Sequence, residues 1–175
     1  MRYLVMLTLL AACDGGGDDP ADDTDVSADG GGLAGMWAIT GEWENQGSCS
    51  GKGEQVAMPT PYLRLADNAG TVELTFCSGL DSCLPTPDWY LGVDGEAWLE
   101  ETHSGYYSEE NGCVSFYTER VAELVEGELK LKEENWQRYD LEVTSERKCL
   151  DEEVPDFFGS GGDCTSSRTL TAVKE

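Results

Sequence analysis

Segments in which apolar and polar residues alternate recur along most of this chain, separated by turn residues such as Gly, Asn and Asp. A period of two places successive side chains on opposite faces of a strand, so the pattern predicts half-buried β-strands. In the first segment Trp37, Ile39 and Trp43 are expected to share one face, with Gly41 between them. Further strands are expected at residues 62–65, 72–76, 90–93, 96–99, 114–117, 122–125, 128–131, 139–143 and 170–173.

Turn residues between these segments predict tight hairpins. Asp94-Gly95 is the strongest signal, because a type I′ turn needs positive φ at both central residues, and Glu126-Gly127 is a weaker one. A further turn is expected at Asn68-Ala69-Gly70, before the segment at residues 72–76. Helical patterning is nearly absent, since Gly127 argues against a long helix in the best window, residues 115–131. Many short strands without crossover helices predict an all-β domain at residues 33–175, an antiparallel up-and-down barrel or a sandwich.

The N-terminus has the layout of a secretion signal. After a positively charged start, residues 3–10 form an uncharged, mostly apolar run, less than half of the about 20 residues that span a membrane. The Leu10-Ala11-Ala12-Cys13 quartet that follows resembles the lipobox of bacterial lipoproteins. This resemblance implies that residues 1–12 are removed and that Cys13 receives acyl chains such as palmitate. The alternative is an ordinary secretory signal, in which Cys13 is an incidental thiol.

The lipobox resemblance also implies a location. Two acyl chains on Cys13 would anchor the protein to a membrane of the bacterial cell envelope, on the exported side, periplasmic or surface. Residues 14–32, which follow, contain seven Asp and no basic residue, and nothing in them can build a core. We therefore expect residues 13–32 to be a disordered, self-repelling linker that sets the domain roughly 25 Å from the bilayer.

Six cysteines remain after Cys13, and in an exported chain they predict up to three disulfides. They are Cys49, Cys77, Cys83, Cys113, Cys149 and Cys164. Six cysteines can pair in 15 ways, which the sequence does not decide. The two pairs that close local loops, Cys77 with Cys83 and Cys149 with Cys164, are the simplest interpretation.

Metal and cofactor signatures are missing from the sequence. A zinc site is not expected, because no Cys-x-x-Cys pair occurs and the single histidine, His103, has no partner at ligand spacing. Asp25, Ser27 and Asp29 imitate the start of an EF-hand loop, but Met36 stands where that loop needs a bidentate Glu. No phosphate loop or dinucleotide fingerprint occurs either, so no cofactor is expected.

Charge and motif content exclude several functions. Asp and Glu total 35 against 11 Lys and Arg, and a net charge of −24 repels phosphate backbones, which argues against nucleic-acid binding. His103 has no hydrolase motif around it, and the Gly-x-Ser-x-Gly motif of α/β-hydrolases does not occur. A pair of carboxylates is not evidence of a glycosidase-like site in this chain, because any two could lie close together on so acidic a surface. We therefore expect no enzyme activity.

A second resemblance concerns the domain. The Leu33-Ala34-Gly35-Met36-Trp37 stretch at the start of the first strand resembles the Gly-x-Trp opening of lipocalin-like domains, and residues 63–76, 89–99 and 123–132 follow that family's loose order. The resemblance implies a barrel with Trp37 closing one end and Arg168 packing across it. It also implies a small apolar ligand in the barrel. The six cysteines and the long irregular segment at residues 145–167 depart from that family.

Aromatic residues are the remaining candidates for a binding site, either as barrel filling or as ligand surface. The ligand-binding candidates are Trp43, Trp89, Trp98, Trp136, Phe157 and Phe158. Two functions are compatible with them. The first is a membrane-anchored envelope lipoprotein whose barrel binds a small apolar ligand. The alternative is a structural or interaction module without a ligand cavity, which presents its surface to an envelope protein or a polysaccharide.

Overall fold

The computed structural model describes residues 32–51, 53–94, 97–159 and 161–175. The expected signal, Cys13 and nearly all of the expected linker lie outside the described residues. No helix in the described part of the chain is long and apolar enough to cross a membrane.

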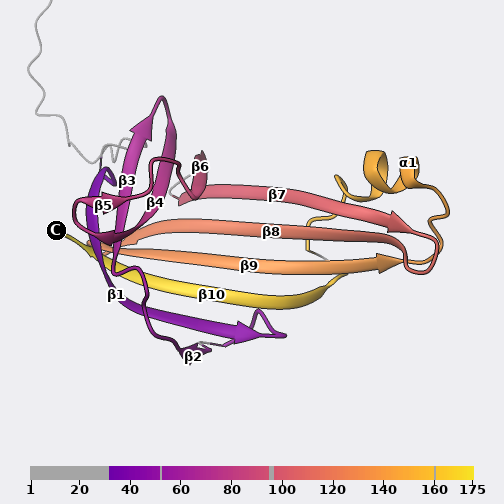
Figure 1. Ribbon diagram of the computed structural model, residues 1–175, viewed down its shortest axis with the longest axis horizontal. Helices are drawn as coiled ribbons and strands as arrows, with labels where there is room; N and C mark the ends of the chain where they lie inside the picture. The colour runs from indigo at the N-terminus through magenta and orange to yellow at the C-terminus, as the bar shows by residue number, and fades with distance from the viewer. Residues whose placement is uncertain (1–31, 52, 95–96, 160) are drawn as a thin grey trace, which may run out of the picture.

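The domain is a closed antiparallel barrel of eight strands, which confirms the all-β prediction (Figure 1). Neighbouring strands of the barrel pair in the order β10, β9, β8, β7, β6, β4, β3, β1, and β1 pairs again with β10 to close the sheet. The barrel strands are β1 (Gly35–Gln46), β3 (Tyr62–Asn68), β4 (Thr71–Gly79), β6 (Trp89–Asp94), β7 (Ala97–Ser108), β8 (Gly112–Val125), β9 (Glu128–Asp140) and β10 (Asp163–Lys174). Short strands β2 (Glu54–Gln55) and β5 (Ser82–Cys83) add to β1 and β4.

Four strands are much longer than the rest of the barrel requires. β7 to β10 have 12 to 14 residues, whereas β3 has 7 and β6 has 6. The long strands therefore run on past the barrel, together with the second half of β1 (Figure 1). We call this extension the projecting sheet. Helix α1 (Glu146–Lys148) and the π-helical turn η1 (Cys149–Glu153) lie at its far end.

Inward-facing side chains fill the barrel. Buried Trp, Leu, Ile, Val and Ala residues from seven of the barrel strands form one hydrophobic cluster, and Phe76 and the β7 residue Trp98, both partly buried, pack against it. Trp37 is 1% exposed, and its Nε1 donates a hydrogen bond to the carbonyl oxygen of Leu33 at 2.8 Å. The cation over the Trp37 ring is that of Lys174, at 5.7 Å, because the register places these two residues opposite each other. Arg168 lies elsewhere, over the ring of Phe76.

A β-bulge in β1 changes which side chains enter the barrel. The pairing with β10 shifts between Ile39 and Gly41, so one residue is inserted and the alternation reverses. Trp43 therefore faces outward, with its ring over Gly41, where a β-carbon would lie 2.2 Å from it. Glu42 faces inward and is 3% exposed. The prediction that Trp43 shares a face with Trp37 is wrong for this reason.

Gly95 of the expected Asp94-Gly95 turn lies outside the described residues, whereas the other two expected turns are present. Ala69 and Gly70 have φ of 54° and 88°, and Glu126 and Gly127 have φ of 54° and 84°. These are the paired positive values of a type I′ hairpin. Two expected strands, 114–117 and 122–125, are parts of the single strand β8. The strand expected at 139–143 is only partly correct, because β9 ends at Asp140 and Val143 is buried at the far end.

Three disulfides are present. Cys77–Cys83 confirms the predicted local loop. The predicted Cys149–Cys164 pair is wrong: Cys149 bonds to Cys113 of β8 at the far end of the projecting sheet, and Cys164 bonds to Cys49. The reason is long-range pairing, since β1 and β10 run side by side and bring residues 49 and 164 together.

Candidate functional site

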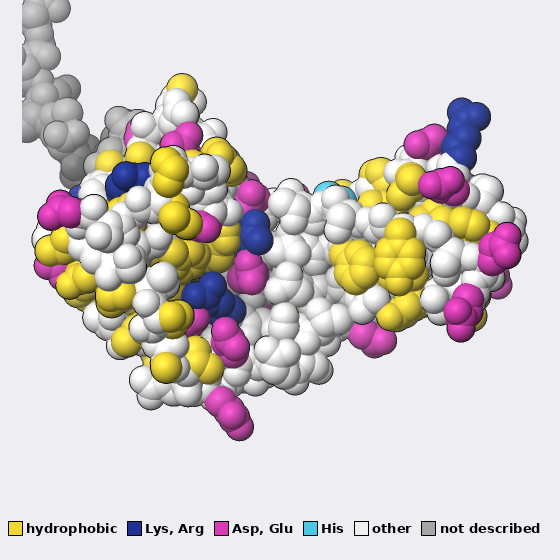
Figure 2. Space-filling view, in the orientation of Figure 1, with side chains coloured by type: hydrophobic (Ala, Val, Ile, Leu, Met, Phe, Trp, Pro, Cys, Tyr) yellow, Lys and Arg dark blue, Asp and Glu magenta, His cyan; other side chains and the backbone are white. Residues whose placement is uncertain are grey.

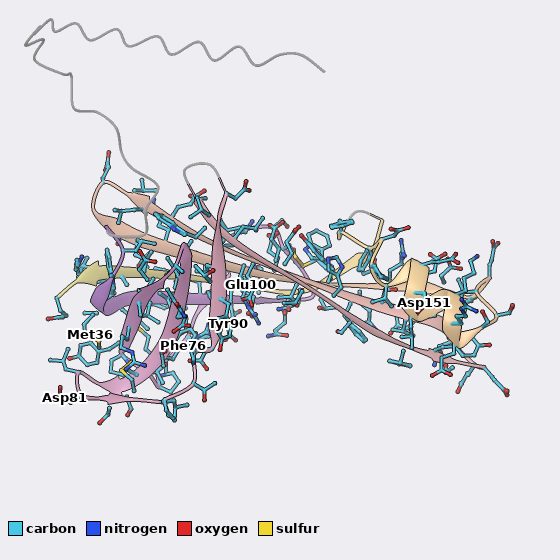
Figure 3. The ribbon with its side chains drawn as sticks, turned by 90° about the horizontal axis from the view of Figure 1, so that it is seen from above. Met36, Phe76, Asp81, Tyr90, Glu100 and Asp151 are labelled. Carbon is cyan, nitrogen blue, oxygen red and sulfur yellow. A yellow bond between two sulfur atoms is a disulfide. The ribbon has the colours of Figure 1, made fainter. Side chains whose placement is uncertain are left out.

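The inner face of the projecting sheet continues the interior of the barrel and begins with a row of alternating charges. Side chains from β7, β8, β9, β10 and β1 lie side by side in one cross-strand register. In order they are Glu100, Arg120, Glu133, Arg168 and Glu44. Opposite charges on adjacent strands stabilise a sheet, so this row is favourable as a unit. Figure 3 places Glu100 where the barrel meets the projecting sheet.

Arg120 joins two neighbouring strands in this row. Its Nη1 lies 2.9 Å from Glu100 Oε2 and its Nε lies 2.7 Å from Glu133 Oε2. Its guanidinium also lies 5.1 Å from the ring centroid of Trp89. Burial of Arg120 lowers its pKa, but the hydrogen bonds and charges of Glu133 and Glu100 outweigh burial, so its pKa is raised. Arg120 is therefore a fixed positive charge in this row.

Arg168 forms the second cationic contact at the barrel mouth. Its Nε donates to Glu42 Oε1 at 2.6 Å, and its guanidinium lies 4.8 Å from the centroid of Phe76. Glu42 Oε2 is buried and has no hydrogen-bond partner among the described residues. The two arginines, each stacked on an aromatic ring, separate the apolar barrel core from the polar face beyond it.

Hydroxyl and amide groups form the next row of the inner face. Thr118 Oγ1 donates to Asn135 Oδ1 at 2.8 Å, and Asn135 Nδ2 lies 3.2 Å from Ser166 Oγ. Thr102 and Gln46 lie beside Thr118 and Ser166 in the same register. These groups hold one another in place and retain further donor and acceptor capacity.

Aromatic side chains end the inner face at its far end. Tyr106 and Phe116 have ring centroids 6.2 Å apart, and Gln137 Nε2 donates to the Tyr139 hydroxyl at 2.7 Å. Tyr106 is 48% exposed and Tyr139 is 55% exposed. Figure 2 shows this hydrophobic cluster over the far part of the projecting sheet, separated from the barrel by a paler polar band. We call Tyr106, Phe116 and Tyr139 the tyrosine platform.

The outer face of the projecting sheet carries a different aromatic group. His103, Tyr117 and Trp136 lie side by side on β7, β8 and β9. Phe157, which is fully buried, and Phe158, which is 55% exposed, pack over Tyr117 with ring centroids 6.2 and 6.0 Å away. The Tyr117 hydroxyl donates to Glu101 at 2.5 Å and also lies 3.2 Å from Glu119 Oε2.

The environment of the Tyr117 hydroxyl raises its pKa well above the ordinary value of a tyrosine. Burial is the largest cause, followed by the hydrogen bond to Glu101 and the negative charge of Glu119. Because the folded state holds the phenol neutral, Tyr117 contributes stability below its unfolded pKa of about 10, and that contribution is lost as the pH rises above this value. In an alkaline titration followed by phenolate absorbance, Tyr117 is expected to ionise only with unfolding.

The comparison that isolates this residue is the Tyr117→Phe variant. It should lack the late absorbance step that coincides with unfolding. An unchanged late step in Tyr117→Phe would show that another tyrosine is responsible.

An open hollow of about 600 Å³ lies beside this aromatic group. Trp136 and Glu134 of β9 line one side, and the Cys49–Cys164 disulfide with Ser48 lines the other. Glu134 is paired with Lys132, whose Nζ is 2.7 Å from Glu134 Oε1. Of the sequence-predicted aromatic candidates, Trp136 alone is among the residues that line it.

The predicted ligand-binding aromatics do not converge on one site. Trp89 is 5% exposed and Trp98 is partly buried, and both pack inside the barrel. Trp43, Trp136 and Phe158 are on the outside, and Phe157 is buried beneath Arg138, whose guanidinium is 4.8 Å from its ring. The tyrosine platform and the charge row were missed. Extending the period-two pattern from Trp98 through Tyr106 would have found them, because one face of this segment carries Glu100, Thr102 and Ser104.

Within the described ranges, no three His, Cys, Asp or Glu side chains are grouped so that they could hold a metal ion. No protein-family model matches this chain, and no curated protein or solved structure matches it either. Function is therefore inferred from the chemistry of the site itself.

Proposed function

We propose that this chain is a lipid-anchored protein of the bacterial cell envelope whose barrel domain binds a polysaccharide on the inner face of the projecting sheet. One observation carries the proposal. A single face of the projecting sheet presents an ion-paired charge row, a row of hydroxyl and amide groups and an exposed tyrosine platform in sequence along the same strands.

The chemistry of this surface matches that of a sugar chain. A pyranose ring has an apolar C–H face that stacks on an aromatic ring, and its rim of hydroxyls needs both donors and acceptors. The tyrosine platform offers the first and Thr118, Asn135 and Ser166 offer the second. Six residues of a strand separate Arg120 from Val114, which lies opposite Tyr106 and Tyr139, so the surface is about 20 Å long. Several sugar units fit that length.

The charge of the protein indicates which class of polysaccharide it would bind. The net charge of −24 disfavours polyanionic chains, and the arginines of the inner face are already paired with glutamates. A neutral or amino-bearing chain is therefore the preferred class.

The lipid anchor would supply the location. Acylation of Cys13 would hold the protein at a membrane, and the acidic linker would let the domain reach roughly 25 Å from it. The surface that binds an envelope polymer would then stay within roughly 25 Å of that membrane. Retention of the full-length protein by membranes, and its release by a Cys13→Ala change, is the direct test of this part.

An apolar ligand inside the barrel has less support. The inward side chains pack on one another, and the Arg120 and Arg168 ion pairs lie between them and the inner face. A ligand would have to displace buried Leu and Trp side chains and break those ion pairs, which costs several kcal/mol for each charge left unpaired.

The tyrosine platform provides the test of polysaccharide binding. In isothermal titrations against neutral, amino and acidic oligosaccharides, the double variant Tyr106→Ala, Tyr139→Ala is expected to bind at least about tenfold more weakly, which corresponds to about 1.4 kcal/mol. The matched control is Tyr90→Ala, because Tyr90 is also 48% exposed but lies on the outside of the barrel. Equal affinity of the double variant and the control would reject the inner face as the site.

A further inference from the structure

Strand β7 has an open edge next to the inner face. Its neighbour β6 pairs only with Ala97, Trp98 and Leu99, whereas β8 pairs with every residue from Trp98 to Ser108. Among the described residues no other strand pairs with β7. Beyond Leu99, one side of this strand therefore has no strand to accept its backbone hydrogen bonds.

The far part of this edge is covered, and over the near part Phe158 packs on the outer face of His103, with ring centroids 5.0 Å apart. Val154 packs against Gly105, where a β-carbon would lie 2.6 Å from Val154 Cγ2, and Cys149 Sγ lies 3.4 Å from the carbonyl oxygen of Tyr106. The open segment is therefore Glu100 to Ser104, five residues and about 17 Å long. In Figures 1 and 2 this segment lies in the saddle between the barrel and the far lobe that contains α1.

This edge lacks most of the usual protection against strand addition. Natural edge strands are often interrupted by proline or by a bulge, or kept very short. β7 has 12 residues and no proline, and its register with β8 is continuous. The protection that remains comes from acidic side chains, above all the exposed Glu101.

The charges around the open edge identify what it would accept. Glu101 and Glu119 lie opposite each other on the outer face, and both contact the Tyr117 hydroxyl. No described cation pairs with either of them. Like charges directly opposite each other in a sheet are unfavourable, and a basic side chain from an added strand would relieve them.

We infer that the open edge of β7 binds an extended, basic segment of a partner protein, which adds to the sheet as a new strand beside residues 100–104. Main-chain hydrogen bonds would supply affinity, and the pairing of Lys or Arg with Glu101 and Glu119 would supply specificity. The net charge of −24 would steer such a partner to the surface.

The same charges disfavour two other occupants. A second copy of this chain carries the same net charge, so edge-to-edge pairing would bring two strongly acidic molecules together. The linker, residues 14–32, carries seven Asp and no basic residue and would meet the same repulsion.

The experiment uses the full mature chain and a synthetic peptide that alternates Lys and Val. Binding is followed by fluorescence anisotropy, and backbone protection by hydrogen exchange with mass spectrometry. In an antiparallel edge strand alternate residues turn their amides to the open side, and here these are residues 100, 102 and 104, since the Tyr106 carbonyl is on that side. Their amides are expected to exchange faster than those of β8 in the free protein and to become protected when the peptide binds. A peptide with the same side chains but N-methylated at alternate residues keeps its charge and loses its hydrogen bonds, so it should bind at least about tenfold more weakly.

Two charge-reversal variants distinguish binding at the open edge of β7 from nonspecific electrostatic attraction to the acidic protein. Glu101→Lys is expected to weaken peptide binding by about tenfold or more, whereas Asp81→Lys, a change of an exposed carboxylate at the barrel end of the molecule between β4 and β5, should alter it less than about twofold. A peptide with Glu in place of Lys should not bind.

Several results would overturn the inference. Equal binding of the N-methylated peptide would mean that the attraction is electrostatic only. Protection outside residues 100–104 would place the site elsewhere. Protection of this segment without peptide, rising with protein concentration, would assign the edge to a second copy of the chain.

Discussion

Replacing Cys49 and Cys164 together with serine is expected to lower the free energy of unfolding by about 5 kcal/mol, the largest loss among the three disulfides. A disulfide stabilises a protein mainly by restricting the unfolded chain, and the restriction grows with the loop that it closes. Cys49–Cys164 spans 115 residues, Cys113–Cys149 spans 36 and Cys77–Cys83 spans 6. Equilibrium unfolding in urea measures each difference.

The matched controls are the other two cysteine pairs replaced by serine. The same loop argument gives losses of about 4 kcal/mol for Cys113–Cys149 and about 2 kcal/mol for Cys77–Cys83. The order of the three variants matters more than any single value. If the Cys77–Cys83 variant lost as much as the Cys49–Cys164 variant, loop length would not determine stability here.

Trp37→Ala is expected to cost about 4 kcal/mol, within the range measured for truncating a buried aromatic side chain. Trp37 is 1% exposed, and the change removes its ring and its hydrogen bond to the Leu33 carbonyl. It also removes the ring beneath the Lys174 ammonium. Urea unfolding monitored by circular dichroism gives the value without depending on tryptophan fluorescence.

Trp43→Ala is the control for this change. Trp43 lies on the outer face and is only half-buried, so its truncation should cost about 1–2 kcal/mol. Equal losses for the two variants would mean that the inward and outward positions of β1 are misassigned.

Much of the fold could be predicted from local pattern. Turn residues indicated two of the described hairpins, and alternation indicated that the domain is all-β. The projecting sheet was harder to predict, because both of its faces carry polar as well as apolar side chains, such as Thr118 with Phe116 and Glu119 with Tyr117, so the contrast between the two faces weakens. That is why residues 114–117 and 122–125 resembled two strands, although β8 is continuous across Thr118 and Arg120.

Other features could not be predicted because they depend on contacts between distant residues. The bulge in β1 follows from its pairing with β10, and it alone brings Glu42 inside and turns Trp43 outside. The register between these strands also sets the Cys49–Cys164 pair. The charge row requires five strands to align, and no local spacing of Glu100, Arg120 and Glu133 reveals that they meet.

The seam between the first and last strands of the barrel has a consequence for how the protein is made. β1 cannot complete its pairing until β10 has emerged, and Glu175 just after β10 also takes part, because its amide donates to the Met36 carbonyl at 3.0 Å. Under the export proposed above, the chain would cross the membrane from its N-terminus, so its first strand would wait beside the translocation machinery with an unpaired edge. Barrels built mainly from long-range pairs fold slowly and expose such edges meanwhile. A periplasmic chaperone that shields β1 until translocation ends would therefore be expected to raise the yield of the native protein.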